Sequence, residues 1–210
     1  MIYEMRTYDL KPRSLPKVLE RWAEAIEYRK TLSPLGAFWY TEIGPLNQII
    51  HVWPYPNLEE RNRVRAEAVA SGRWPPKASE HIVQMRSEIM MPWPGSPELP
   101  VGKVGPFFEM RTYTMSPGDQ PKVQKAWNKV LASRTKISPV IALWFSEIGG
   151  LNKFVHIWPY ASLDARMAAR QAALSGGIGW PPTPAPDEPQ FATLAQETKI
   201  LFAAPFSPLQ

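Results

Sequence analysis

The side chains best suited to acid–base chemistry in this chain are two histidines, His51 and His156, each followed two positions later by a tryptophan. Histidine titrates near neutral pH, so either imidazole could take up or release a proton during a reaction. We therefore treat His51 and His156 as candidate general bases. The alternative is a histidine held by a carboxylate of a neighbouring strand, which would serve the fold and no reaction.

Charged and aromatic residues accompany both histidines in the same order. Arg6 and Arg111 could bind a carboxylate or phosphate of a ligand through two N–H groups, or could form internal ion pairs with Glu4 and Glu109. A flat apolar ligand could also stack on a tryptophan of the set. The candidate ligand-binding residues are Glu4, Arg6, Tyr8, Glu42, Trp53, Glu109, Arg111, Tyr113, Glu147 and Trp158.

Composition excludes several other chemistries. The absence of cysteine rules out disulfides and thiol nucleophiles. No H-x-H, H-E-x-x-H, P-loop or G-x-G-x-x-G pattern occurs in a suitable context, so we expect no metal and no cofactor. The net charge is +5, but the basic residues are scattered. The densest group, Arg61, Arg63 and Arg65, lies beside glutamates on a predicted helix, which favours a solvated face and argues against nucleic-acid binding.

Targeting and membrane signals are also lacking in the sequence. The first residues, Met1 to Arg6, show no basic region followed by an apolar run, and no apolar run approaches the ~18 residues of a transmembrane helix. The expectation is a soluble cytoplasmic protein with no membrane partner.

An internal repeat determines the predicted architecture. The segment Glu4–Tyr8 recurs as Glu109–Tyr113, and the same offset relates many later residues. Matched pairs include Trp22/Trp127, Arg29/Arg134, Trp39/Trp144, His51/His156 and Trp53-Pro54-Tyr55/Trp158-Pro159-Tyr160. Trp74-Pro75-Pro76 corresponds to Trp180-Pro181-Pro182, with a one-residue insertion in the second unit. We therefore predict two units, residues 1–92 and 107–204, joined by a proline-rich linker over 93–106.

Each unit reads as β-α-β-β-α-β. Period-two alternation predicts strands at 3–10, 37–43, 48–53 and 82–91, and an amphipathic stripe predicts a helix within 12–32. Asn57 can cap a second helix that ends near Ser71. This order is typical of the ferredoxin-like fold. The fold class is therefore α+β, with tandem ferredoxin-like units placing their open sheet faces together in one barrel.

Strand alternation divides the side chains into two sets. Tyr3, Met5 and Thr7 form an apolar set, while Glu4, Arg6 and Tyr8 form a polar and aromatic one. We expect the apolar set to pack under the helices and the polar and aromatic set to line the barrel interior. Glu42 and Glu147 are assigned to the interior as well.

Three motifs together resemble NIPSNAP domains, and the resemblance covers both units. They are Glu4–Tyr8 in the first strand, Trp39–Asn47 leading into the hairpin, and His51–Tyr55 in the third strand. NIPSNAP domains are similar in fold to dimeric α+β barrels, which include cofactor-free monooxygenases, isomerases, haem-handling proteins and members without known activity. The family implies no agreed reaction or catalytic residues. Its eukaryotic members are linked to mitochondria, and the targeting extension of those members is not seen here.

Two functions follow as hypotheses. In the first, the barrel binds a small metabolite and acts as a cofactor-independent enzyme, with His51 as base and Arg6 stabilising an oxyanion. In the second, the protein is a non-catalytic scaffold that binds protein partners. A homo-oligomer is expected under both, because ferredoxin-like sheets often leave edges to be covered.

Overall fold

The computed structural model describes all residues, 1–210, as two successive β-α-β-β-α-β units. The first unit comprises β1 (Ile2–Leu10), α1 (Leu15–Leu32), β2 (Ala37–Ile43), β3 (Gln48–Tyr55), α2 (Leu58–Ala70) and β4 (Ile82–Pro92). The second comprises β5 (Phe107–Met115), α3 (Gln120–Ile137), β6 (Ala142–Ile148), β7 (Lys153–Tyr160), α4 (Leu163–Ser175) and β8 (Thr193–Ala203). The predicted order of elements is confirmed in both units.

Local sequence explains where the helices begin and end. A proline stands in the first turn of α1, where its missing N–H costs nothing, and Ser33 leaves the helical conformation before Pro34. The side chain of Asn57 caps α2 by accepting a hydrogen bond from the Glu60 N–H at 2.9 Å. Ser162 caps α4 in the same way. No helix combines the length and apolarity needed to cross a membrane.

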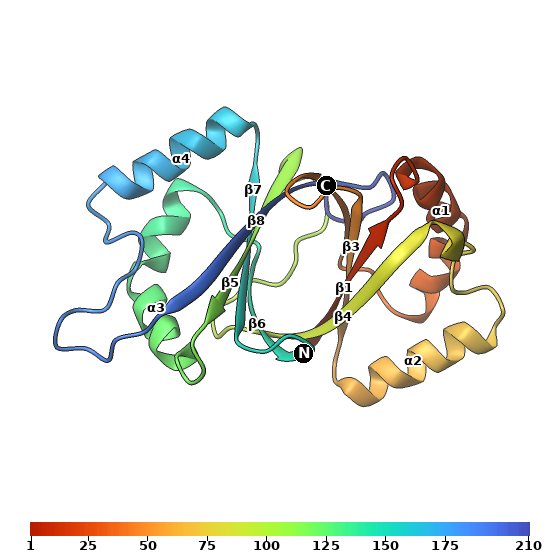
Figure 1. Ribbon diagram of the computed structural model, residues 1–210, viewed down its shortest axis with the longest axis horizontal. Helices are drawn as coiled ribbons and strands as arrows, with labels where there is room; N and C mark the ends of the chain where they lie inside the picture. Colours follow the sequence, from red (N-terminus) through yellow and green to blue (C-terminus); the bar gives the residue numbers. More distant parts are fainter.

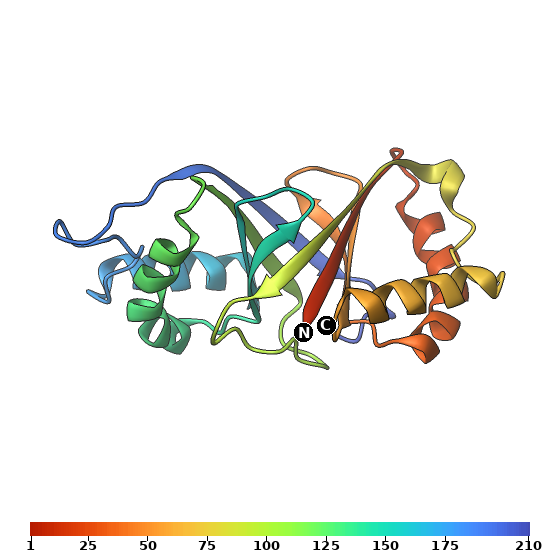
Figure 2. The same ribbon diagram turned by 90° about the horizontal axis from the view of Figure 1, so that it is seen from below.

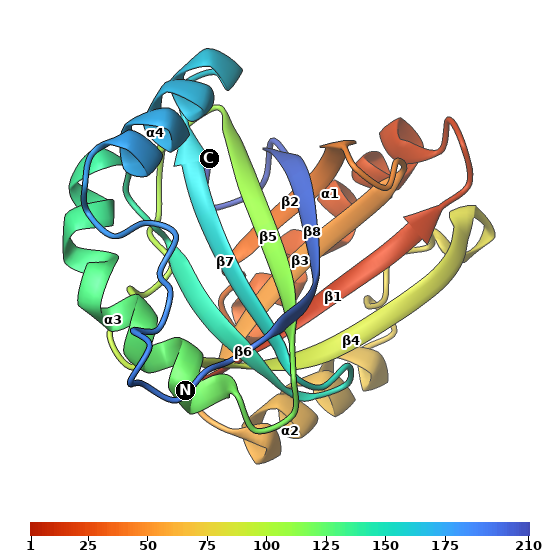
Figure 3. The same cartoon turned by 60° about the vertical axis from the view of Figure 1, so that its left-hand side comes forward.

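The eight strands close into one barrel in the order β1-β3-β2-β8-β5-β7-β6-β4. Each unit supplies four neighbouring strands, and the units join where β2 pairs with β8 and β4 pairs with β6, both antiparallel. Figure 1 shows the helices in two layers, α1 and α2 on one side of the barrel and α3 and α4 on the other. Figure 2 shows the barrel between these two helix layers from below, and Figure 3 shows the curved strands from the side.

Closure of the barrel within one chain leaves no sheet edge unpaired. Free edges were the main physical reason to expect a homo-oligomer, since unpaired strand edges recruit further chains. That reason is absent here, so the homo-oligomer stays a prediction without support from the sheet.

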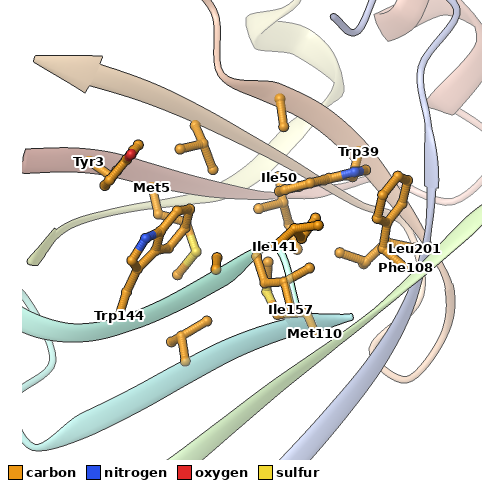
Figure 4. Packing of buried hydrophobic residues seen from close by; sticks show 14 of the residues in the cluster. Tyr3, Met5, Trp39, Ile50, Phe108, Met110, Ile141, Trp144, Ile157 and Leu201 are labelled. Atoms are coloured by element: carbon orange, nitrogen blue, oxygen red, sulfur yellow. The ribbon is translucent and has the colours of Figure 1, made fainter. Parts of the chain in front are cut away.

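The middle of the barrel is a dry core contributed by both units. Figure 4 shows these side chains converging from opposite strands. The cluster contains Tyr3, Met5, Ala37, Trp39, Ile50, Val52, Met90, Phe108, Met110, Ile141, Ala142, Trp144, Val155, Ile157, Leu201 and Leu209. Leu99 of the linker packs against the cluster, and Gly102 pairs with Leu209 of the C-terminal tail. The linker and the tail therefore cover one end of the barrel.

This core shows that the predicted assignment of strand faces in β1 and β3 was wrong. Tyr3, Met5 and their neighbours line the barrel interior, whereas the polar and aromatic set lies on the outer face under the helices. Alternation separates the two faces of a strand but does not say which face meets which layer. The barrel centre is enclosed by sheet on all sides, so it takes the set with the least polar surface.

Candidate functional site

Each half of the barrel carries a cavity between its outer face and its own helices. The first has a volume of about 440 Å³ and lies between β1, β3, β4, α1, α2 and the segment that follows α2. The second, of about 220 Å³, occupies the equivalent place in the second unit. Small-molecule sites typically have volumes of roughly 300–1,000 Å³, an apolar wall and a few polar groups. The first cavity falls within this range and the second is smaller.

One carboxylate in the first unit gathers several guanidinium groups. Oε1 of Glu4, a fully buried residue, accepts hydrogen bonds from Arg6 at 2.8 Å, Arg61 at 2.6 Å and Ser87 at 2.8 Å. Arg65 of α2 adds a third guanidinium 3.7 Å away. Burial opposes the ionisation of Glu4, but the Arg61 hydrogen bond and the charges of Arg65 and Arg6 prevail and lower its pKa to about 2. Glu4 is therefore a carboxylate at neutral pH.

A second arginine in this unit is buried without a carboxylate. Arg29 of α1 is 2% exposed and donates to the hydroxyls of Ser33 at 2.8 Å and Tyr55 at 2.7 Å. Its guanidinium lies over the ring of Trp53 at 4.1 Å and near that of Trp74 at 5.8 Å. Burial lowers the pKa of Arg29, although arginine stays charged in proteins. The stack on tryptophan offsets part of the cost of burying this charge.

The predicted histidine base sits at the floor of the cavity. His51 is surrounded by the rings of Tyr8, Trp22 and Phe38, and its Nδ1 accepts a hydrogen bond from the Trp53 indole N–H at 2.7 Å. An indole can only donate, so the proton of the neutral imidazole resides on Nε2. Burial, followed by the charge of Arg6, holds the pKa of His51 well below its usual value. Nε2 is buried and has no partner, which makes His51 a hydrogen-bond donor awaiting an acceptor.

The second unit repeats the main features of this arrangement. Glu109 accepts from Arg111 at 3.2 Å and from Arg166 at 2.5 Å. Nδ1 of His156 accepts from the Trp158 indole at 2.6 Å, and Nε2 again lacks a partner. Arg134 lies over Trp158 at 4.2 Å. The only hydrogen bond of the Arg134 guanidinium, to Tyr160, is long at 3.4 Å, and two of its nitrogens are buried without partners.

Both sites therefore hold more positive than negative charge. In the first unit Glu4 faces the guanidinium groups of Arg6, Arg61 and Arg65, and Arg29 lies nearby with no acid. The second unit has the matching set Glu109, Arg111, Arg134, Arg166 and Arg170. A buried excess of cations is costly unless an anion completes it.

The structure brings most of the predicted site residues together, in two groups and not in one. Glu4, Arg6, Tyr8, His51 and Trp53 share the outer face of the first half-sheet, and Glu109, Arg111, Tyr113, His156 and Trp158 share that of the second. Assigning Glu42 and Glu147 to the interior was wrong. Both are exposed near the ends of β2 and β6 and line neither cavity. At the strand ends the sheet no longer encloses a side chain, so a carboxylate stays in water.

The arginines of α2 and α4 are residues of the candidate sites that the sequence did not predict. Arg61 and Arg65 were interpreted as part of a solvated face, but both reach Glu4. Only Arg63 behaves as predicted and pairs with Glu60 and Glu67 at the surface. The repeat contained a signal that could have identified them. Arg61 and Arg65 correspond to Arg166 and Arg170 in the second unit, whereas the residue that corresponds to Arg63 is an alanine.

The Trp-Pro-Pro motifs also belong to the sites. Trp74 packs edge-on against Trp22 at 5.1 Å and Trp53 at 6.0 Å, so it forms a wall of the first cavity. Trp180 does the same in the second unit.

A third cavity, of about 520 Å³, opens at the uncovered end of the barrel. Its charges largely neutralise one another, since Arg86 contacts Asp9 at 3.0 Å and Lys153 contacts Glu88 at 2.5 Å. It lacks the aromatic walls and the cation excess of the other two. No three histidine or acidic side chains come together in positions to hold a metal ion.

The buried neutral histidines predict how acid destabilises the protein. The folded state keeps both imidazoles unprotonated, whereas the unfolded chain binds protons below pH ~6.5, so falling pH favours unfolding. Urea titrations should show the free energy of unfolding decline by up to about 1.4 kcal/mol per pH unit for each histidine below that pH. His51→Gln with His156→Gln should flatten the decline between pH 6.5 and 5, and His81→Gln serves as the control. An unchanged slope in the double variant would mean that these imidazoles are already protonated in the folded state.

Comparison with known proteins agrees with this architecture. The fold and the paired sites define an α+β barrel made of two ferredoxin-like halves. The NIPSNAP family model matches residues 3–97 and again 108–208. The chain therefore belongs to the NIPSNAP family.

The sequence alignments with similar proteins cover nearly the whole chain. A NipSnap homolog of Dictyostelium discoideum is 28% identical and aligns over 95% of this chain and 86% of its own. Human NipSnap homolog 3B is 27% identical, over 99% of this chain and 85% of its own. Among solved structures, a putative monooxygenase of Fusobacterium nucleatum shares the fold with a TM-score of 0.64 at 8% identity, covering 97% of this chain and 92% of that one.

Proposed function

We propose that this protein binds small organic anions, one in each of its two helix-covered cavities. The observation that carries the proposal is the buried cation excess beside an unpartnered imidazole N–H, present twice. Guanidinium groups match the geometry of a carboxylate, and a neutral imidazole can donate one further hydrogen bond to its oxygen. The aromatic walls favour a ligand with a planar or apolar body.

The role of His51 and His156 differs in this proposal from that of a general base. Their Nδ1 atoms are occupied by tryptophan, and their Nε2 atoms carry the proton. This arrangement supports donation to a ligand oxygen and not proton abstraction. If the bound molecule reacts, the same donors would stabilise negative charge that develops on that oxygen, without a cofactor.

A thermal-shift screen of aromatic and aliphatic carboxylates against the matching neutral amides tests the proposal. Benzoate and phenylpropionate should raise the melting temperature, and their amides should not. A ligand at a hundred times its dissociation constant adds about 2.7 kcal/mol to the free energy of unfolding, which is readily detected. Equal shifts with acids and amides, or none with either, would contradict an anion site.

A variant of His51 tests whether its imidazole N–H takes part in carboxylate binding. His51→Phe preserves an aromatic ring of similar width but removes the N–H, so carboxylate binding at the first site should weaken by about tenfold. His81→Phe, in the turn before β4, is the matched control and should bind as the unmodified protein does. Unweakened binding in His51→Phe would remove this histidine from the proposed site.

A further inference from the structure

The two cavities differ in size because of particular side chains. Phe154 in β7 lines the second cavity, where β3 of the first unit has the smaller Ile49, which does not line the first. Phe191, just before β8, also projects into the second cavity. These rings help explain why about 220 Å³ remains in the second unit against about 440 Å³ in the first.

The longer loop of the second unit is held against its helix. Glu188 contacts Lys129 at 2.5 Å and Lys125 at 3.3 Å, and both lysines belong to α3. The backbone N–H of Ala192 donates to Asp119 at 2.8 Å, so the chain on either side of Phe191 is anchored. The first unit has no such segment, and a short turn over Ser79–His81 leads directly into β4.

The mouth of the first cavity carries three exposed apolar side chains beside the polar Arg65, Ser79 and Gln84. Val69 of α2 and Val83 and Met85 of β4 line the cavity while remaining 58%, 66% and 57% exposed. Large apolar side chains that gather exposed at a cavity mouth mark a binding surface. In the second unit the position of Met85 is taken by Gln196, and Leu194, at the position of Val83, does not line the cavity.

Polarity thus changes along the first cavity from its buried end to its mouth. Arg6, Arg29 and His51 line the buried end of this cavity, and Val83 and Met85 line its mouth. A ligand that satisfies both ends has an anionic head and an apolar tail. The second cavity has an equivalent head site but only one exposed apolar residue at its mouth, Leu174, at the position of Val69.

We propose that the first cavity takes a single-chain carboxylic acid, with its carboxylate at Arg6 and Arg29 and its alkyl tail leaving between α2 and β4. The second cavity takes only short or compact carboxylates. This inference rests on the proposed anion binding, and it adds the class of ligand and the difference in ligand length between the two sites. Burial of each methylene along Val69, Val83 and Met85 should tighten binding about three- to fourfold until the tail passes the rim.

The test is calorimetric titration of the full chain with straight-chain carboxylates of increasing length, from butyrate to decanoate, and with decanamide. Affinity at one site per chain should rise with length, and decanamide should bind at least about tenfold more weakly than decanoate. Val83→Asp places a charge on the rim and should abolish the length dependence while butyrate still binds. Leu194→Asp is the matched control, an equally exposed residue at the equivalent strand position, and should change nothing.

The outcomes separate the two proposals. Binding of butyrate and benzoate with no dependence on chain length would overturn the tail site and leave the anion sites intact. Equal affinity for decanoate and decanamide would overturn the assignment of the head. Failure of every carboxylate to bind would overturn both, and an equal effect of Leu194→Asp would place the tail elsewhere.

Discussion

Replacing Glu4 by glutamine should lower the free energy of unfolding at pH 7 by about 3 kcal/mol. The carboxylate is fully buried and neutralises Arg6 and Arg61 through hydrogen bonds of 2.8 and 2.6 Å. Without it, buried guanidinium groups face one another unpaired. Denaturant titration of the unligated protein measures the loss. Glu60→Gln, which removes a partner of Arg63 at the surface, is the control and should change stability far less.

Glu4 also contributes to the decrease in the free energy of unfolding at acid pH. The pKa of Glu4 is lowered from 4.5 in the unfolded chain to about 2 in the fold, so its contribution is complete above pH ~4.5. It is lost progressively as the pH falls toward about 2. Glu4→Gln should therefore show a shallower decline in stability within this window. A decline as steep as that of the unmodified protein would mean that other carboxylates set the acid limit.

Replacing Arg134 by methionine should stabilise the unligated protein and weaken anion binding at its second site. The guanidinium is 3% exposed, has no carboxylate partner and makes one long hydrogen bond. Replacing a buried ion pair by apolar residues of similar volume is often neutral or stabilising by about 1–4 kcal/mol, and Arg134 lacks even the carboxylate that such a pair would supply. The same change removes a charge-assisted contact to the ligand, so affinity for a short carboxylate should fall about 10- to 100-fold at that site.

Opposite signs for stability and affinity distinguish a ligand site from a structural arginine. Arg29→Met should show the same loss of affinity at the first site but a smaller gain in stability, because Arg29 bonds both Ser33 and Tyr55. Arg63→Met, at the surface of α2, is the control and should leave binding unchanged. If Arg134→Met instead destabilises the protein, the stack on Trp158 outweighs the buried charge and the arginine is structural.

The repeat made much of this fold predictable. Alternation located the strands of one unit and the repeat carried them over to the other. The cap at Asn57 follows from a side chain that accepts a backbone N–H, and Ser162 plays the same part in the second unit. Pairing of the two half-sheets into a barrel followed from their single helix-covered faces. These features depend on local patterns and on duplication, and both can be observed in one chain.

Which face of each strand meets the helices could not be predicted from these sequence patterns. Alternation in β1 separates Met5 from Glu4 equally well whichever side the helices cover. The deciding quantity is the solvation of the finished barrel, whose centre must exclude polar groups from all eight strands at once. The candidate residues were therefore grouped correctly but placed in the wrong layer.

The helix arginines were missed for a related reason. A charged residue on a predicted helix is usually solvated, and Arg61 and Arg65 follow that pattern in sequence. Their side chains turn toward Glu4 because the helix lies above a strand whose carboxylate is buried and needs partners. Long side chains of this kind reach several ångströms beyond their helix, and only the packed structure shows in which direction.

The most direct test of the central claim is a crystal structure of the protein soaked with 4-bromobenzoate, in which anomalous scattering locates the bromine. We expect the ligand in the cavities between helices and sheet, with its carboxylate within hydrogen-bond distance of Arg29 or Arg134 and of a histidine Nε2. Bromine in the interior of the barrel, or at the charged barrel mouth and in neither helix-covered cavity, would contradict it.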